Sequence, residues 1–302
     1  MEVFNRVLAL FVVMVVGAIA GKIGLVSEHF RRDLSHFLAK IALPMFLLNN
    51  MLSGHGVDRL VQGLPVLLIA LGVYVLSILL AGLIGKLLKV SPEKLPAYKF
   101  SMIFSNMGFL GLPVLDAVFG SEGVFYGALF VLVADTMMWT YGVYLFKGSS
   151  GEGFHPKEII TPNLVAILSG IVLLVLGVKL PVFLSLPVGL IGGMTPAFSM
   201  VVLGLMLSEM QAEDIYQGPL TILSGLYRLL LLPLLIYAIL KLLGFSDYLL
   251  LVPVIISGMP VAAMGAVQAA NYGKDFKTMV GLIVSSTLLS LLMIPLLLKI
   301  LL

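Results

Sequence analysis

Cysteine is absent from the 302-residue chain, which excludes disulfide bonds and thiolate chemistry. Charged residues are also scarce: they make up 11% of the sequence, whereas apolar residues make up 60% and the mean hydropathy is +1.14. An ordinary soluble domain carries about 25% charged residues. The composition therefore excludes such a domain and indicates an all-α polytopic membrane protein.

Histidine is rare as well, and its placement argues against a metal centre. His29, His36, His55 and His155 lie in or near connecting segments, and none pairs with another at metal-ligand spacing. The formal net charge of +3 is small, and Lys and Arg lie mainly between apolar runs. This pattern indicates membrane topology rather than a nucleic-acid partner. We therefore expect a protein without a metal, without a cofactor and without nucleic acid.

Apolar runs suited to crossing a lipid bilayer recur along the whole chain. They cover roughly residues 4–22, 34–53, 60–88, 95–119, 122–146, 162–179, 186–208, 220–243, 248–272 and 277–301. A polar stretch rich in Gly, Ser and Glu separates the first five runs from the last five. We predict a first five-helix repeat at 1–147, a cytoplasmic linker at 148–158 and a second five-helix repeat at 159–302.

Five spans per half is an odd number, so the second half enters the membrane from the side opposite to the first. The two repeats are therefore expected to be inverted. The connecting segments on one side hold most of the basic residues: Lys22, Arg31, Arg32, Lys86, Lys89, Lys94, Lys99, Lys147, Lys157, Lys274 and Lys277. Those on the other side hold only Arg6, Arg59, Lys179, Lys241 and Lys299. The positive-inside rule places the first set in the cytoplasm and both termini outside.

The segment 95–119 contains residues that a spanning helix rarely tolerates at its centre. Its middle reads Ser105-Asn106-Met107-Gly108-Phe109-Leu110-Gly111-Leu112-Pro113. Proline removes a backbone N–H, and glycine lowers helix propensity. A break at this depth is tolerated only where the backbone is buried in protein or lines a polar cavity. Such breaks form the substrate sites of many secondary transporters. A proline kink relieved by neighbouring helices is the alternative.

A second interruption, Gly258-Met259-Pro260, lies near the middle of the segment 248–272. Gly120 and Gly273 end the two interrupted segments and lie 153 residues apart, so the halves of the chain have a similar layout. After each break a new half-helix begins, whose free N–H groups and dipole present partial positive charge. Two such ends facing one space would form an anion site without Lys or Arg.

Two amides are candidate ligands for a substrate. The amide of Asn106 can donate to a carboxylate and accept from a protonated one, although it can also cap the broken helix. Gln268 lies about two helical turns beyond Pro260 and would face the same space. Together with the break residues Gly108, Pro113 and Pro260, these amides make up the predicted substrate site.

One carboxylate and one guanidinium lie inside apolar segments. An intramembrane carboxylate is costly, so we predict that Asp135, in the segment 122–146, couples transport by binding a proton or a cation. The alternative is a structural carboxylate paired with Thr136 or Arg228. Arg228 precedes the apolar run 229–243, and we expect it to extend to the cytoplasmic interface.

The run 105–113 closely resembles the Asn-x-Gly-Phe-x-Gly-x-Pro signature of the auxin efflux carrier family, which includes plant PIN proteins and many bacterial transporters. Other segments resemble that family in the same order: Lys22-Ile23-Gly24-Leu25, Ala42-Leu43-Pro44, Asp135-Thr136-Met137-Met138-Trp139-Thr140, Thr161-Pro162-Asn163-Leu164 and Gly258-Met259-Pro260. The similarity spans nearly the whole chain.

The resemblance implies ten transmembrane helices in two inverted five-helix repeats, with the fourth and ninth helices broken and crossing, as in bile-acid symporters. It also implies a scaffold from spans 1, 2, 6 and 7 and a transport domain from spans 3–5 and 8–10, often in a homodimer. Substrates of the family are small organic anions: auxin in plants and carboxylates such as malate or malonate in bacteria. Asn106 falls on the family's substrate-binding asparagine. We therefore expect a secondary transporter of the plasma or inner membrane that works by alternating access.

Two positions depart from the family pattern. Bacterial members usually carry Asn where this chain has Met264, which removes a polar contact, and Asp135 stands where an amide is usual. A sodium-coupled organic-anion symporter of the bile-acid type is the alternative, but it needs oxygen ligands that this sequence offers sparingly. A passive channel or a sensor is another alternative. An intramembrane enzyme is disfavoured, because the spans hold no Gly-x-Gly-Asp dyad, His-Glu-x-x-His motif or Ser–His pair.

Overall fold

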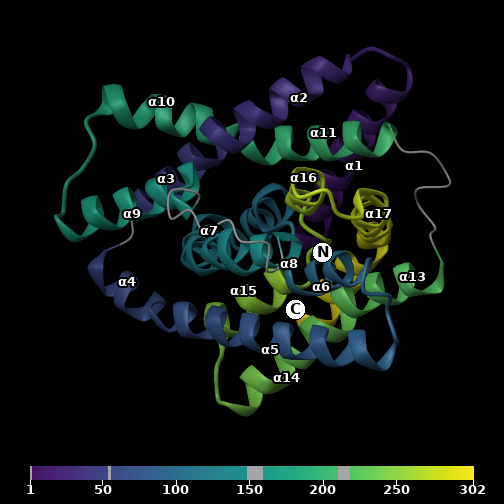
Figure 1. Cartoon of the computed structure of the whole chain (residues 1–302). Helices are drawn as coiled ribbons and strands as arrows, with labels where there is room; N and C mark the ends of the chain where they lie inside the picture. The colour runs from purple at the N-terminus through teal and green to yellow at the C-terminus, as the bar shows by residue number, and fades with distance from the viewer. Residues whose placement is uncertain (1, 54–55, 148–158, 210–217) are drawn as a thin grey trace. The chain divides into compact units, whose positions relative to one another are not determined.

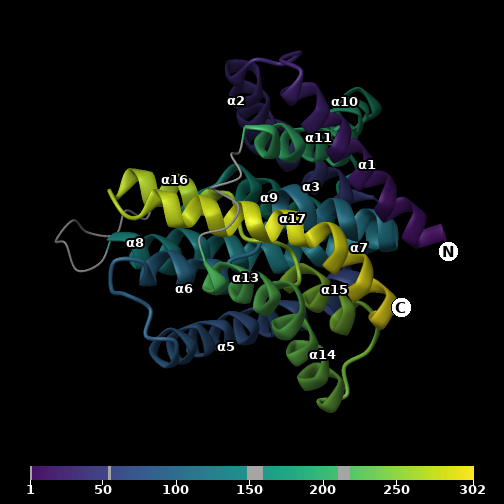
Figure 2. The same cartoon turned by 90° about the vertical axis from the view of Figure 1, so that its right-hand side faces the viewer.

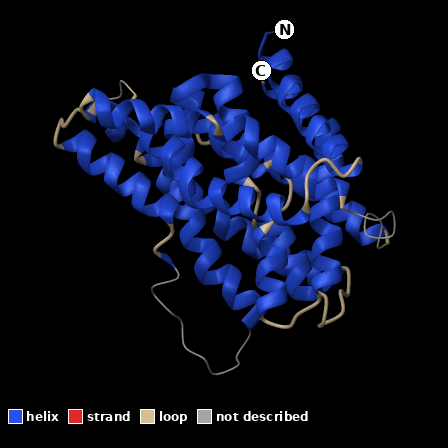
Figure 3. Ribbon diagram, turned by 90° about the horizontal axis from the view of Figure 1, so that it is seen from above, coloured by secondary structure: helices blue, strands red, loops and turns tan. Residues whose placement is uncertain are grey.

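A computed structural model of the protein describes residues 2–53, 56–147, 159–209 and 218–302. In these ranges the regular structure is helical, with one isolated β-bridge between Ser105 and Val261 (Figure 3). The prediction of an all-α protein is confirmed for this part of the chain. The predicted linker at 148–158 lies outside the described residues.

Six helical stretches in the described ranges are long and apolar enough to cross a membrane: Glu2–Lys22, Val57–Leu87, Met107–Lys147, Val182–Ser208, Pro219–Leu242 and Phe276–Leu301. Pro162–Val175 and Asp247–Ser257 are shorter apolar helices. These lengths and compositions fit a multi-pass membrane protein. They do not establish the predicted count of ten spans.

The chain forms two compact units, and each unit draws on both halves of the sequence. Unit 1 comprises residues 1–67, 108–132 and 160–209. Unit 2 comprises residues 68–107, 133–159 and 210–302. The boundaries cut through α5 (Pro65–Leu87), the π-helical turn η2 (Met107–Gly111) and α7 (Leu112–Met137).

In unit 1, α1 runs along α11, and α3 packs against α9 and α10 (Figure 1). Besides its parts of α5, η2 and α7, this unit consists of α1 (Glu2–Lys22), α2 (Glu28–Phe37), the π-helical turn η1 (Leu38–Ala42), α3 (Leu43–Leu52), α4 (Val57–Gly63), α9 (Pro162–Val175), α10 (Val182–Gly193) and α11 (Thr195–Ser208).

Glycines let α1 and α11 approach closely. A Cβ atom on Gly17 would lie 2.5 Å from the carbonyl oxygen of Val201, and one on Gly204 would collide with the carbonyl oxygen of Met14. Gly21 faces Ser208 in the same way. The small residues from Gly17 to Gly21 therefore serve close helix packing within the chain, against α11.

In unit 2, α17 packs against α6, α13 and α16, and α14 packs against α15 (Figure 2). Besides its parts of α5, η2 and α7, this unit consists of α6 (Leu95–Ile103), the π-helical turn η3 (Met138–Gly142), α8 (Val143–Lys147), α13 (Pro219–Leu226), the π-helical turn η5 (Tyr227–Leu231), α14 (Leu232–Leu242), α15 (Asp247–Ser257), α16 (Met264–Asn271) and α17 (Phe276–Leu301).

Two glycines end the interrupted segments where the sequence placed them. Gly120 has a φ of 63° and kinks α7, and Gly273 has a φ of 61° two residues after α16. This left-handed conformation disfavours residues with a Cβ atom, so glycine suits both positions. The kink at Gly120 and the end of α16 near Gly273 agree with the two predicted segment ends.

Candidate functional site

Both predicted helix breaks are present. α6 ends at Ile103, and helical structure resumes at Met107. α15 ends at Ser257, and α16 begins at Met264. The first break is therefore three residues long and the second six, and both lie deep in the protein, because nearly all of their residues are buried.

The two breaks pair through their main chains. The N–H of Asn106 donates to the carbonyl of Pro260 at 2.7 Å, and the N–H of Ala262 donates to the carbonyl of Phe104 at 3.1 Å. The hydroxyl of Ser286, on α17, accepts from the N–H of Val261 at 3.1 Å. A buried break exposes polar backbone groups that need partners. Here each break supplies partners for the other, so the two interruptions form one structural element.

The two residues predicted to bind substrate through their side-chain amides, Asn106 and Gln268, belong to unit 2. Asn106 lies in the first break and is 7% exposed. Gln268 lies on α16 and is 2% exposed, and its Nε2 donates to the carbonyl of Met138 at 3.4 Å. The Oε1 atom of Gln268 has no hydrogen-bond partner in the described ranges. A buried acceptor without a partner is costly, which makes Gln268 a candidate for contact with a ligand that donates a hydrogen bond.

Asp135 also lies in unit 2, on the last part of α7, and is partly buried. Met138, whose carbonyl accepts from Gln268, follows it by three residues, which is about one helical turn. Tyr74, on α5, interacts electrostatically with both Asp135 and Arg228. The structure thus brings the predicted coupling residue into one unit with Asn106, Pro260 and Gln268.

The other two predicted substrate residues belong to unit 1. Gly108 lies in η2, where a Cβ atom would come within 3.0 Å of the side chain of Leu43. Pro113 is buried in the first turn of α7. The site in unit 2 therefore consists of Asn106, Pro260 and Gln268.

The prediction that Arg228 extends to the cytoplasmic interface was wrong. Its side chain is 1% exposed and donates hydrogen bonds to the carbonyls of Met102, Ile103 and Met259. The position of Arg228 at the start of an apolar run does not show that the ends of α6 and α15 supply carbonyls nearby. These carbonyls replace the hydrogen bonds to water that the guanidinium loses on burial.

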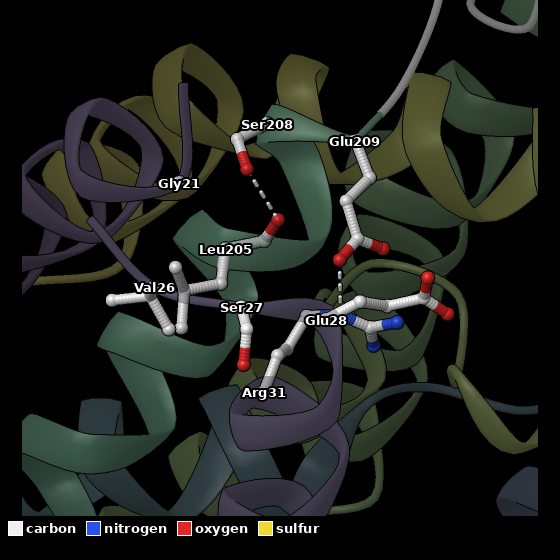
Figure 4. Close-up of a pocket in the computed structure, with 8 residues that line it drawn as sticks. All are labelled: Gly21, Val26, Ser27, Glu28, Arg31, Leu205, Ser208 and Glu209. Carbon is white, nitrogen blue, oxygen red and sulfur yellow. Dashed lines mark hydrogen bonds and ion pairs between the residues drawn. The ribbon is translucent and has the colours of Figure 1, made fainter. Parts of the chain in front are cut away.

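Unit 1 contains a polar pocket of about 350 Å³ that the sequence did not suggest. Figure 4 shows Arg31 and Glu209 pointing toward one another in its lining, and their Nε and Oε1 atoms lie 2.6 Å apart. Glu28 is in turn bonded to Arg32 at 2.6 Å. Each charged side chain that lines this pocket already has an ion-pair partner, and none of the predicted site residues lines it. The breaks in unit 2 therefore remain the candidate site.

Comparisons with known proteins identify the family of the chain. The chain matches the family model described as "Membrane transport protein" over residues 2–158 and 152–298. It is 29% identical over 297 residues to an uncharacterized transporter of Methanothermobacter thermautotrophicus, and the aligned region covers 97% of this chain and 96% of the relative. It is 27% identical over 301 residues to an uncharacterized transporter of Methanocaldococcus jannaschii, with 96% of each chain covered. The chain therefore belongs to the membrane transport protein family, which is the auxin efflux carrier family that its Asn-x-Gly-Phe-x-Gly-x-Pro motif resembles.

Proposed function

We propose that this protein is a secondary transporter that moves small carboxylates across a membrane by alternating access. The observation that supports this function best is the paired break, in which Asn106 and Pro260 are joined by their main chains within a buried region. Membership of a transport family favours a transporter over an enzyme, and the protein is proposed to have no catalytic residues. The sodium-coupled symporter of the bile-acid type is not favoured, because the family match is to auxin efflux carriers.

The substrate-binding residues in this proposal are Asn106, Pro260 and Gln268 of unit 2, and the same role for Gly108 and Pro113 of unit 1 stays a prediction from the sequence. The half-helix that begins at Met264 carries the partial positive charge of its dipole at its N-terminus, which favours a carboxylate. The Asn106 amide donates to the same carboxylate. The unpartnered Oε1 of Gln268 accepts a hydrogen bond, so a substrate with a hydroxyl or a protonated carboxyl group fits better than a fully ionised one.

The proposed architecture has ten spans in two inverted repeats, with a scaffold from spans 1, 2, 6 and 7 and a transport domain from spans 3–5 and 8–10. Two features support it. The helices before the breaks end at Ile103 and Ser257, which lie 154 residues apart, close to the spacing of Gly120 and Gly273. Unit 1 holds the segments assigned to spans 1, 2, 6 and 7, although it also includes residues 108–132.

The remaining parts of the proposal concern coupling and the membrane. Asp135 binds a proton or a cation during the cycle, as an intramembrane carboxylate close to the site can do. The protein lies in the plasma or inner membrane with both termini outside, which follows from the distribution of Lys and Arg. It acts as a homodimer, with the lipid bilayer and a small organic anion as its other partners.

Binding of carboxylates to Asn106→Ala tests this function. Losing one hydrogen bond to a charged group costs about 1.5–3 kcal/mol, which lowers affinity by roughly 10- to 150-fold. A panel of mono- and dicarboxylates, with and without hydroxyl groups, would be titrated into purified wild-type protein and the variant. Asn271→Ala, which removes an exposed amide at the end of α16, is the matched control and should bind like the wild type. Equal affinity in the wild type and Asn106→Ala would refute the role of Asn106 in the site.

A further inference from the structure

Arg228 is the largest of the fully buried side chains in the described ranges. It lies on η5, and its hydrogen bonds in those ranges all go to main-chain carbonyls. Its Nη1 donates to Met102 at 3.0 Å and to Ile103 at 3.1 Å, and its Nε donates to Met259 at 3.3 Å. All four residues belong to unit 2. We call this arrangement the carbonyl clamp.

The carbonyls of the clamp mark the ends of the two half-helices before the breaks. Met102 and Ile103 are the last two residues of α6, and Met259 is the second residue after α15. The last carbonyls of a helix have no partner within the helix and carry partial negative charge. One guanidinium therefore satisfies acceptors from both interrupted segments and offsets the negative ends of both helix dipoles.

A second observation concerns the kind of group that such carbonyls usually bind. In transporters with broken helices, unwound carbonyls and half-helix C-termini coordinate the coupling cation. Here the guanidinium occupies that position, and a guanidinium stays protonated at neutral pH. Its fork of donors also fits several carbonyls at once, which a single ammonium group does not.

The surroundings of Arg228 fit a fixed positive charge. The hydroxyls of Tyr74 and Tyr227 interact with it electrostatically, and Tyr74 links it to the region of Asp135. Burial of a guanidinium is costly, so the hydrogen bonds and partial charges around it must compensate. The three carbonyls of the clamp supply that compensation.

We propose that Arg228 is a built-in cation of the substrate site, which holds the two breaks together and takes the place of a dissociable alkali-metal ion. This inference rests on the proposed transport function. It makes Arg228 a positioning residue: its charge keeps the ends of α6 and α15 in the geometry that presents Asn106 and Pro260 to an anion. It follows that substrate binding needs no sodium.

Chemical rescue tests the clamp without knowledge of the substrate. Arg228→Ala leaves a cavity at three carbonyls, and its thermal midpoint should fall by on the order of 5–10 °C. Guanidinium chloride, at concentrations too low to denature, should restore a large part of this loss saturably, whereas choline chloride at equal ionic strength should not. Arg32→Ala removes an exposed arginine paired with Glu28 and is the matched control, with no expected change in midpoint or response to guanidinium.

Two further variants keep the test decisive if Arg228→Ala does not fold. Arg228→Lys retains the charge and should be more stable than Arg228→Met, which retains only the bulk. Equal stability of the Lys and Met variants, or an Ala variant that folds but gains nothing from guanidinium, would overturn the proposal.

Malonate uptake into liposomes, with sodium replaced by choline, separates the clamp from the proposed function. Uptake by the wild type that is unchanged in choline supports the built-in cation, and uptake that requires sodium overturns it. A wild type that moves no carboxylate of the panel counts against the proposed function. In that case the guanidinium rescue still decides the role of Arg228.

Discussion

The close packing of α1 on α11 predicts that Gly204→Ala destabilises the protein, although alanine is the better helix former. A Cβ atom on Gly204 would collide with the carbonyl oxygen of Met14 and lie 2.6 Å from the amide nitrogen of Ala18. These two residues are four positions apart in α1, the spacing of an α-helical hydrogen bond. The added methyl group would therefore press on the backbone of the neighbouring helix, which cannot rotate away as a side chain can.

The expected magnitude follows from that distance. Ordinary van der Waals contact begins near 3.4 Å, so α1 and α11 would have to separate by about 0.8 Å to relieve the contact with Ala18 alone. Overpacking of a close interface costs about 1–3 kcal/mol. The better helix propensity of alanine returns up to about 1 kcal/mol. With that gain subtracted, we expect a net loss of up to about 2 kcal/mol for Gly204→Ala.

Thermal unfolding of the detergent-solubilised protein measures this effect. The matched control is Gly72→Ala on α5, where no heavy atom lies within 4 Å of the added Cβ, so the control should be as stable as the wild type or up to about 1 kcal/mol more stable. The midpoint of Gly204→Ala should fall by a few degrees. A midpoint equal to that of Gly72→Ala would show that the helices tolerate the methyl group and would refute the packing argument.

Two other predictions concern the site. Gln268→Leu removes a buried acceptor without a partner, so the free protein should become more stable. The affinity of this variant for a hydroxycarboxylate should fall by about 2- to 10-fold. A variant that binds this ligand as tightly as the wild type would contradict the proposed contact with Gln268. Asp135→Asn mimics the protonated acid, so a variant that folds should bind substrate but lose most of the pH dependence of transport. An unchanged pH profile of uptake into liposomes would assign Asp135 a structural role.

Much of the fold was predictable because the bilayer imposes strong constraints on sequence. Apolar length and loop composition indicated the helices, and a proline or glycine in the middle of a segment indicated the breaks. Gly120 and Gly273 were predictable as ends because a left-handed turn suits glycine. The pairing of Gly17 with α11 was not predictable, because a small-residue pattern does not reveal which helix it contacts.

The site was predictable to a smaller extent. Asn106 and Gln268 could be identified because amides are rare inside apolar segments. Arg228 was misplaced, because a long basic side chain near the start of an apolar run can either reach the interface or turn inward. The choice depends on carbonyls from Met102 and Met259, which are remote in sequence and indistinguishable from any other backbone group.

Two π-helical turns carry groups that the site uses: η3 supplies the Met138 carbonyl that Gln268 contacts, and η5 supplies Arg228. In evolutionary terms, a π-helical turn is an α-helix that has gained one residue. The extra residue is absorbed within the wide turn, so deleting one residue from η5 would restore a regular helix while the helices on either side keep their relative orientation. The side chains of the turn would then point in other directions, and the guanidinium could no longer reach both breaks while α13 and α14 kept their packing. Relatives with a one-residue deletion in this turn should therefore lack the arginine as well, so that insertion and clamp are inherited together.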